Sequence, residues 1–216
     1  MDNGITSLGC EFLGRVLKKE VESPITTLKL DHNPIHAEGV SMLAEGLVMN
    51  PTIKILSLNY AEIEKAAAKP LVHILLYIKS QLKELYLKGN NLESEGVAEI
   101  MKAVQLAKSL NKVDFADNKI KESGSGGLVT KEIGSTVTFE ECTVRSFDFS
   151  YNYFDDEAVD FIKNKLEEGG FVFDFKITLK LDEAYQIAFK KMLDTNKKKA
   201  KKKAKKATKK KKKKKK

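Results

Sequence analysis

Residues 82–104 read LKELYLKGNNLESEGVAEIMKAV, and this stretch combines two hydrophobic periods on either side of one asparagine. Before Asn90, Leu85 and Leu87 alternate with polar residues, which is the period of a half-buried strand. After Asn90, Gly96, Ile100 and other small or apolar residues recur at every fourth position, which places them on one face of a helix. The stretch therefore predicts a short strand, a tight turn and an amphipathic helix.

The same pattern recurs along the chain. Copies begin at residues 25, 53, 82, 110 and 144, at intervals of 28, 29, 28 and 34 residues, and a sixth strand is expected near Val172. The turn asparagine recurs as Asn33, Asn90, Asn118 and Asn152. Ala61 replaces it in the second copy, where we expect a looser turn. Residues 3–17 match the second half of a unit, so the given chain is expected to begin inside a repeat.

Stacking is what allows such units to bury their apolar sides, because neither the strand nor the helix of one unit forms a core alone. Neighbouring strands lie ~4.8 Å apart, whereas packed helices need ~10 Å, so a stack of these units bends. We therefore expect an α/β solenoid in the shape of a horseshoe, with a parallel sheet on the concave side and helices on the convex side.

This repeat resembles the ribonuclease-inhibitor-like class of leucine-rich repeats over residues 3–180. The class includes ribonuclease inhibitor, the sensor arms of nucleotide-binding immune receptors, the Ran GTPase activator and the actin pointed-end caps. The resemblance implies the horseshoe fold and the binding of another protein on the concave sheet. A GTPase-activator-like regulator is less favoured, because that resemblance would imply a longer array and an acidic tail.

Repeat phase and composition divide the chain into four parts. We expect a partial N-terminal repeat over residues 1–24, leucine-rich repeats over 25–170, a capping strand and helix over 171–196, and a lysine-rich tail over 197–216. Within the repeats, the 34-residue interval contains the glycine-rich segment 123–127. That segment predicts a flexible insertion and a helix that is short or irregular.

The formal net charge of +9 conceals two regions of opposite sign. Sixteen lysines lie within residues 197–216, which leaves 23 of the 39 basic residues against all 30 acidic ones and a net charge of −7 for the rest of the chain. The tail is expected to be disordered, because its like charges repel one another and it has nothing to bury.

The tail lysines are candidate ligands for a polyanion. An acidic cytoskeletal polymer, a nucleic acid and an anionic lipid surface are all compatible with them, since lysine without arginine or aromatic residues offers only point charges. A nuclear-import signal and a merely solubilising tail are the alternatives. The candidate residues are Lys197, Lys198, Lys199, Lys201, Lys202, Lys203, Lys205 and Lys206.

Residues that flank the paired strand leucines should point into the concave face. Three of them are tyrosines of the kind enriched at binding hot spots, and three are aspartates that would form an acidic floor for a basic protein partner. These candidates are Tyr60, Tyr86, Tyr151, Asp114, Asp117 and Asp148. The alternative is that they are solvated outer positions of the sheet with no partner.

Enzymatic chemistry finds little support in the sequence. His32 and His36 straddle a turn rather than one helical face, and Cys10 and Cys142 are too few for a zinc site or a disulfide framework. Residues 155–157 form an acidic run that is expected to open a helix, where negative charge favours the helix dipole. We therefore expect no catalytic, cofactor or metal site.

The chain has no apolar run of membrane-spanning length and no secretory signal pattern at its N-terminus. We expect a cytoplasmic protein, with the cytoskeleton or a cilium as candidate sites and the nucleus as the alternative. The preferred function is that of a non-enzymatic adaptor or scaffold, which binds a protein on its concave face and a polyanion through its tail. The alternative is a cytoskeletal or ciliary structural component that docks on an acidic polymer through the tail.

Overall fold

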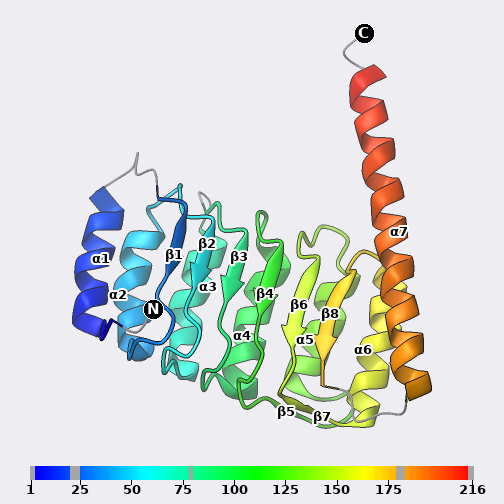
Figure 1. Ribbon diagram of the computed structural model, residues 1–216, viewed down its shortest axis with the longest axis horizontal. Helices are drawn as coiled ribbons and strands as arrows, with labels where there is room; N and C mark the ends of the chain where they lie inside the picture. Colours follow the sequence, from blue (N-terminus) through cyan, green and yellow to red (C-terminus); the bar gives the residue numbers. More distant parts are fainter. Residues whose placement is uncertain (1–2, 20–24, 78–79, 179–182, 214–216) are drawn as a thin grey trace.

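The computed structural model describes residues 3–19, 25–77, 80–178 and 183–213 (Figure 1). Lys19, residues 203–204 and residues 206–213 are described by their backbone only.

Six short strands form one parallel sheet in the order β1-β2-β3-β4-β6-β8. The strands are β1 (Thr27–Lys29), β2 (Ile55–Ser57), β3 (Glu84–Tyr86), β4 (Lys112–Asp114), β6 (Ser146–Phe149) and β8 (Asp174–Ile177). Their central apolar residues pair in register as Leu28, Leu56, Leu85, Val113, Phe147 and Phe175. The predicted α/β architecture with one parallel sheet is confirmed.

A helix follows each of the six strands of this sheet, and another precedes the first. The helices are α1 (Ser7–Lys19), α2 (His36–Leu47), α3 (Ala68–Leu76) with a preceding 3-10 turn η1 (Lys65–Ala67), α4 (Glu93–Leu106), α5 (Leu128–Thr138), α6 (Asp156–Gly169) and α7 (Glu183–Lys213). Figure 1 shows α1 to α6 side by side on one face of the sheet, which leaves the other face uncovered. The hydrophobic core lies between these two layers.

Aromatic residues fill the core at the C-terminal end of the stack. Phe149 is fully buried, and its ring centroid lies 5.5 Å from that of Phe115 and 5.7 Å from that of Phe175. Phe147 and Phe154 lie 6.1 Å from the same ring, one stacked and one edge-on. Phe115 follows β4, Phe147, Phe149 and Phe154 belong to the next unit, and Phe175 lies on β8. The contacts of these rings therefore join three neighbouring units.

The turn asparagines form a buried ladder along the carboxyl ends of the strands. Asn90 donates through Nδ2 to the carbonyls of Leu58 and Leu87, and its Oδ1 accepts from the backbone N–H groups of Ala61 and Ile63. Asn152 makes the equivalent bonds two units further on; it donates to Phe115 and Phe149 and accepts from Asn118 and Ile120. Each carboxamide thus satisfies buried backbone groups of two adjacent units.

Ala61 interrupts this ladder, yet its turn remains buried. The carbonyl of Ala61 accepts from the backbone N–H of Ile35 at 3.2 Å, and the Ala61 side chain has no exposed surface. A backbone oxygen therefore takes part of the role that a carboxamide oxygen plays elsewhere, which explains how the second unit keeps its place without an asparagine.

The glycine-rich insertion differs from what composition predicts. Helix α5 follows it as a regular helix of 11 residues. Directly before the insertion, strand β5 (Lys121–Glu122) pairs in parallel with β7 (Tyr153–Phe154) of the next unit. Asp155 accepts from the Ser123 hydroxyl and the Gly124 N–H, and also caps α6 by accepting from Ala158. The insertion is held by polar contacts to the next unit, which local composition does not reveal.

Helix α7 runs through Lys213, whereas the composition of residues 197–216 predicts no regular structure. Its first part packs on the end of the stack through Phe189 and Met192, and buried Asn196 donates to the carbonyls of Leu166 and Val172. Lysine and alanine are good helix formers, and extending an anchored helix avoids the nucleation penalty. Figure 1 shows the lysine-rich end of α7 extending beyond the sheet.

The four-part division of the chain stays a prediction. Its first boundary, between residues 24 and 25, falls next to residues 20–24, which lie outside the described residues.

Candidate functional site

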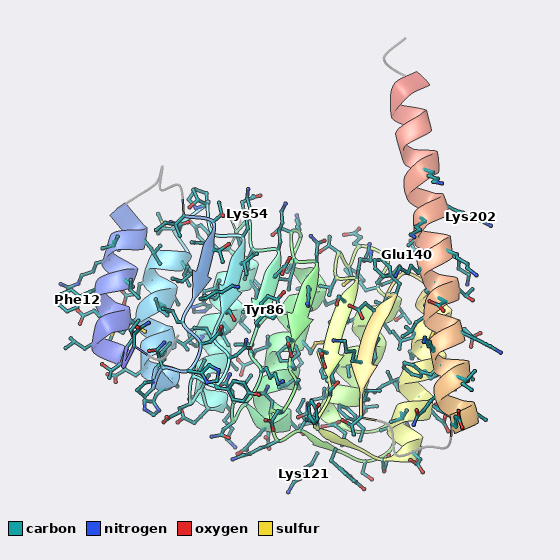
Figure 2. All side chains as sticks on the ribbon, in the orientation of Figure 1. Phe12, Lys54, Tyr86, Lys121, Glu140 and Lys202 are labelled. Carbon is teal, nitrogen blue, oxygen red and sulfur yellow. The ribbon has the colours of Figure 1, made fainter. Side chains whose placement is uncertain are left out.

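The candidate site is the side of the six-stranded sheet that the helices leave uncovered, called here the open face. In each strand the central apolar residue points toward the helices, so the residues on either side of it point the other way. Figure 2 labels Tyr86 near the middle of this face. One row of the open face, paired in register, consists of Lys29, Ser57, Tyr86, Asp114, Asp148 and Lys176.

Asp114 and Asp148 lie directly opposite each other in the register of β4 and β6. Asp148 accepts from the Lys176 ammonium at 3.0 Å and from the Ser150 N–H, whereas Asp114 accepts from the Ala116 N–H. The structure therefore brings these two predicted site residues together. It also shows that Asp148 already has a cationic partner.

The two aspartates differ in pKa because Asp148 accepts hydrogen bonds from both Ser150 and Lys176. Burial raises the pKa of Asp114 above its ordinary value, and the charge of Asp148 adds to this effect. Burial opposes ionisation of Asp148 as well, but hydrogen bonds from Ser150 and Lys176 bring the pKa of Asp148 below its ordinary value. Among the described residues, no lysine pairs with Asp114 as Lys176 does with Asp148, and the charges of Lys88 and Lys112 lower the pKa of Asp114 only in part.

Tyr86 is a half-buried platform beside these carboxylates. Its hydroxyl donates to Glu84, and the Lys112 ammonium lies 4.9 Å from the centroid of its ring. Burial, followed by the hydrogen bond to Glu84, raises the pKa of Tyr86 above its ordinary value. The ring therefore stays neutral and is held in one orientation by groups of its own and the neighbouring strand.

Tyr60 and Tyr151 lie at the carboxyl ends of the strands, next to the asparagine ladder. Both have positive φ angles, 51° and 60°, as does every residue at this repeat position. These residues are His32, Tyr60, Gly89, Asp117 and Tyr151. The Tyr60 ring stacks on His32 at 4.8 Å and covers Gly89, where a Cβ would come within 2.2 Å of it.

Lys88 connects the two exposed tyrosines. Its ammonium lies 5.9 Å from the Tyr60 ring centroid and 5.5 Å from that of Tyr151, which is 71% exposed. Beside Tyr151, the rim of the sheet has a hollow of about 790 Å³ that Leu128 and Lys119 also line. Tyr60, Lys88 and Tyr151 thus form a ridge with an apolar and cationic character.

Asp117 does not join the other two aspartates. It is exposed on the turn after β4, with a φ of 54°, whereas Asp114 lies within the strand. The predicted acidic floor is therefore split, and Lys112 and Lys176 offset part of its charge. Sequence reasoning missed Lys176, although the paired apolar residues Phe175 and Ile177 place it in the same row.

The tail lysines are presented by helix α7. Six of the candidates have exposed side chains: Lys197, Lys198, Lys199, Lys201, Lys202 and Lys205. Figure 2 shows Lys202 pointing away from the body of the protein. Lys203 and Lys206 lie outside the residues whose side chains are described.

The described residues hold no cluster of three or more histidines, cysteines or acidic residues arranged for a metal ion. His36 lies 3.6 Å from Glu62 and 3.7 Å from Glu64, at an exposed turn. Within the described part of the chain, no helix has both the length and the apolar character to span a membrane.

Replacing Lys176 by glutamine should raise the pKa of Asp148. In the wild-type protein this pKa is lowered, so the Asp148 carboxylate stabilises the fold above about pH 4 and loses that contribution as the pH falls through its folded value. In Lys176→Gln the loss should begin at higher pH. Carboxyl-carbon NMR titration measures both values, and Lys29→Gln, in the same row on β1, is the control. An unchanged Asp148 pKa in Lys176→Gln would contradict the assignment.

Comparison with known proteins agrees with this geometry. The profile of the Leucine Rich repeat family matches residues 23–44 and 80–101. Ribonuclease inhibitor from Mus musculus is 33% identical over 96 residues, which are 44% of this chain and 20% of the inhibitor. These matches support a leucine-rich repeat protein of the ribonuclease-inhibitor-like class. The chain spans about one fifth of the length of the curated relative that it matches.

Solved structures with a similar fold include the following two. The tropomodulin C-terminal domain from Caenorhabditis elegans has a TM-score of 0.59 and 18% identity, over 74% of this chain and 92% of that one. Leiomodin-1 Actin-Binding Site 2 has a TM-score of 0.57 and 16% identity, over 92% of this chain and 94% of that one. At these identities the likeness concerns the fold.

Proposed function

We propose that this leucine-rich repeat protein is a non-enzymatic protein-binding module of the cytoplasmic cytoskeleton, with actin as its partner. The partner binds the open face, which we take to line the concave side of a horseshoe. The unequal spacings of strands and helices, ~4.8 Å against ~10 Å, support that curvature.

The observation that carries the proposal is the organisation of the open face. Tyr86 is held by Glu84 and Lys112, and the half-buried Asp114 beside it lacks the lysine that Asp148 has. A preorganised aromatic platform next to an incompletely compensated carboxylate is suited to a lysine or arginine of a partner. Tyr60 and Tyr151 extend the contact surface along the turn edge.

Actin is favoured among protein partners by the extent of the structural likeness. The similarity to Leiomodin-1 Actin-Binding Site 2 covers 92% of this chain, and the tropomodulin domain has the same fold. A general adaptor that binds a basic protein would use the same surface. The cytoskeletal version is preferred because one of the similar structures is named as an actin-binding site.

The exposed lysines of α7 would add a second, less specific contact with an acidic surface of the same polymer. Lysine ammonium groups bind as point charges, so this contact should weaken steeply with added salt. The open-face contact should depend less on salt, because its groups are partly buried.

Binding to purified actin tests the proposal directly. We expect the full-length protein to bind actin monomers or to sediment with filaments, and Tyr86→Ala with Asp114→Ala to weaken binding at least about 30-fold, as loss of a hot spot does. The matched control is Glu99→Ala with Lys102→Ala on α4, which should bind normally. Binding that survives the Tyr86 and Asp114 changes would rule out the open face, and a wild-type protein that binds neither monomeric nor filamentous actin would rule out actin.

The role of α7 is tested in the same assay. A chain ending at Asn196 keeps the contacts of Phe189, Met192 and Asn196 with the body, and loses the candidate lysines. We expect its binding to be weaker than wild type at low salt and equal to wild type at high salt. Equal binding at both salt concentrations would remove the lysines from the proposed function.

A further inference from the structure

Helix α1 presents an apolar stripe to solvent at the N-terminal end of the stack. Leu8 is 61% exposed, Phe12 59% and Val16 53%, and they follow one another at intervals of four residues on one helical face. Figure 2 shows Phe12 on the side of α1 that faces away from α2. The guanidinium of Arg15, on the same helix, lies 6.0 Å from the centroid of the Phe12 ring, and the stripe remains more than half exposed.

The opposite side of α1 makes the closest helix contact in this end of the stack. A Cβ on Gly46 would lie 2.1 Å from the Gly14 carbonyl oxygen, and one on Gly14 would lie 2.5 Å from the Met42 carbonyl oxygen. Helix α2 therefore packs on α1 through Gly39, Met42 and Gly46, with Gly39 next to Cys10.

Comparison of α1 with the equivalent positions of α2 shows what kind of element the exposed stripe can contact. Phe12 and Val16 precede Met42 and Gly46 by 30 residues each, and Gly9 precedes Gly39 by the same interval. The side of α1 that carries Phe12 is thus equivalent to the side of α2 that packs on its preceding helix. It is a surface for another helix.

We propose that this helix is α1 of a second copy of the chain, packed antiparallel about a two-fold axis at Phe12. Leu8 and Val16 lie four residues on either side of Phe12, so the axis places Leu8 of one copy against Val16 of the other. The stripe is therefore complementary to itself.

The charged residues beside the stripe favour α1 of a second copy of the chain over an amphipathic helix of another protein. Glu11 and Arg15 lie on the same flank of α1, where they pair within the helix. In the antiparallel arrangement equal flanks face each other, and Glu11 of one copy comes within two residues, ~3 Å along the axis, of Arg15 of the other. Two symmetric ion pairs would form.

The expected dimer is weak and leaves the other surfaces accessible. A helix of 13 residues is ~20 Å long, so the helix pair buries less than the ~1,000 Å² of a stable interface. Helix α7 lies at the other end of the stack, so both open faces and both lysine-rich helices remain exposed (Figure 1).

Sedimentation velocity of the full chain from about 10 μM to about 1 mM tests this inference. We expect a concentration-dependent dimer in the wild type, and at least about tenfold weaker association in Phe12→Glu. Leu106→Glu, at an equally exposed site on α4, is the matched control and should associate like the wild type. Circular dichroism confirms that each variant is folded.

A charge swap distinguishes the two-fold arrangement from other contacts. Glu11→Arg and Arg15→Glu should each weaken association, and the double variant should restore it, because the swapped charges again face each other. A monomeric wild type would overturn the proposal and leave the α1 surface to a different protein. Association that survives Phe12→Glu, or a double variant without rescue, would also overturn it.

Discussion

Phe149→Ala should lower the free energy of unfolding by about 3–5 kcal/mol. The Phe149 side chain is fully buried and contacts the rings of Phe115, Phe147, Phe154 and Phe175. Alanine removes the ring's buried area and leaves a cavity that these neighbours cannot close, because each is fixed on a different strand or turn.

Urea denaturation followed by circular dichroism measures this loss. Tyr151→Ala is the matched control, since Tyr151 is an aromatic residue of the same unit that is 71% exposed, and its loss should change the free energy of unfolding by less than about 0.5 kcal/mol. Similar effects for the two variants would contradict the position of Phe149 in the core.

Asn90→Ala should lower the free energy of unfolding by about 2–5 kcal/mol. The Asn90 carboxamide is buried and serves four backbone groups of two units, the N–H groups of Ala61 and Ile63 and the carbonyls of Leu58 and Leu87. Alanine provides no replacement for these bonds, and an unsatisfied buried polar group costs more than its bond contributes.

Denaturation measures the total loss of stability, whereas amide hydrogen exchange shows which residues lose protection. In Asn90→Ala the amides of Ala61 and Ile63 should exchange faster, while those of β6 and β8 keep their protection. Asn91→Ala is the control, because Asn91 has no side-chain hydrogen bond among the described residues. A stable Asn90→Ala protein with unchanged exchange would show that the ladder is dispensable.

Most of the fold could be predicted from local pattern. The spacing of Leu28, Leu56 and Leu85 at a constant period predicts parallel strands in register, because identical units stack with identical offsets. The asparagines were recognisable for the same reason. The insertion at 123–127 and the helix at 197–213 were not, because the insertion depends on contacts with Asp155 and the helix on the contacts of Asn196 with Leu166 and Val172, residues far from these segments in the chain.

The candidate site was predictable only in part. Period alone places Tyr86, Asp114 and Asp148 in one row of the open face, and the structure agrees. The repeat period does not indicate that Asp117 lies on the turn outside that row, or that Lys176 forms an ion pair with Asp148.

The amino-acid sequence was sufficient for the repeat, the strand order and the identity of the core, because burial of apolar residues at a fixed period leaves one way to stack the units. Tertiary structure alone decided which charges pair, how Tyr60, Lys88 and Tyr151 meet, and where α7 points. Those outcomes depend on contacts between side chains about 28 or more residues apart in the chain, whose geometry exists only once neighbouring units have packed.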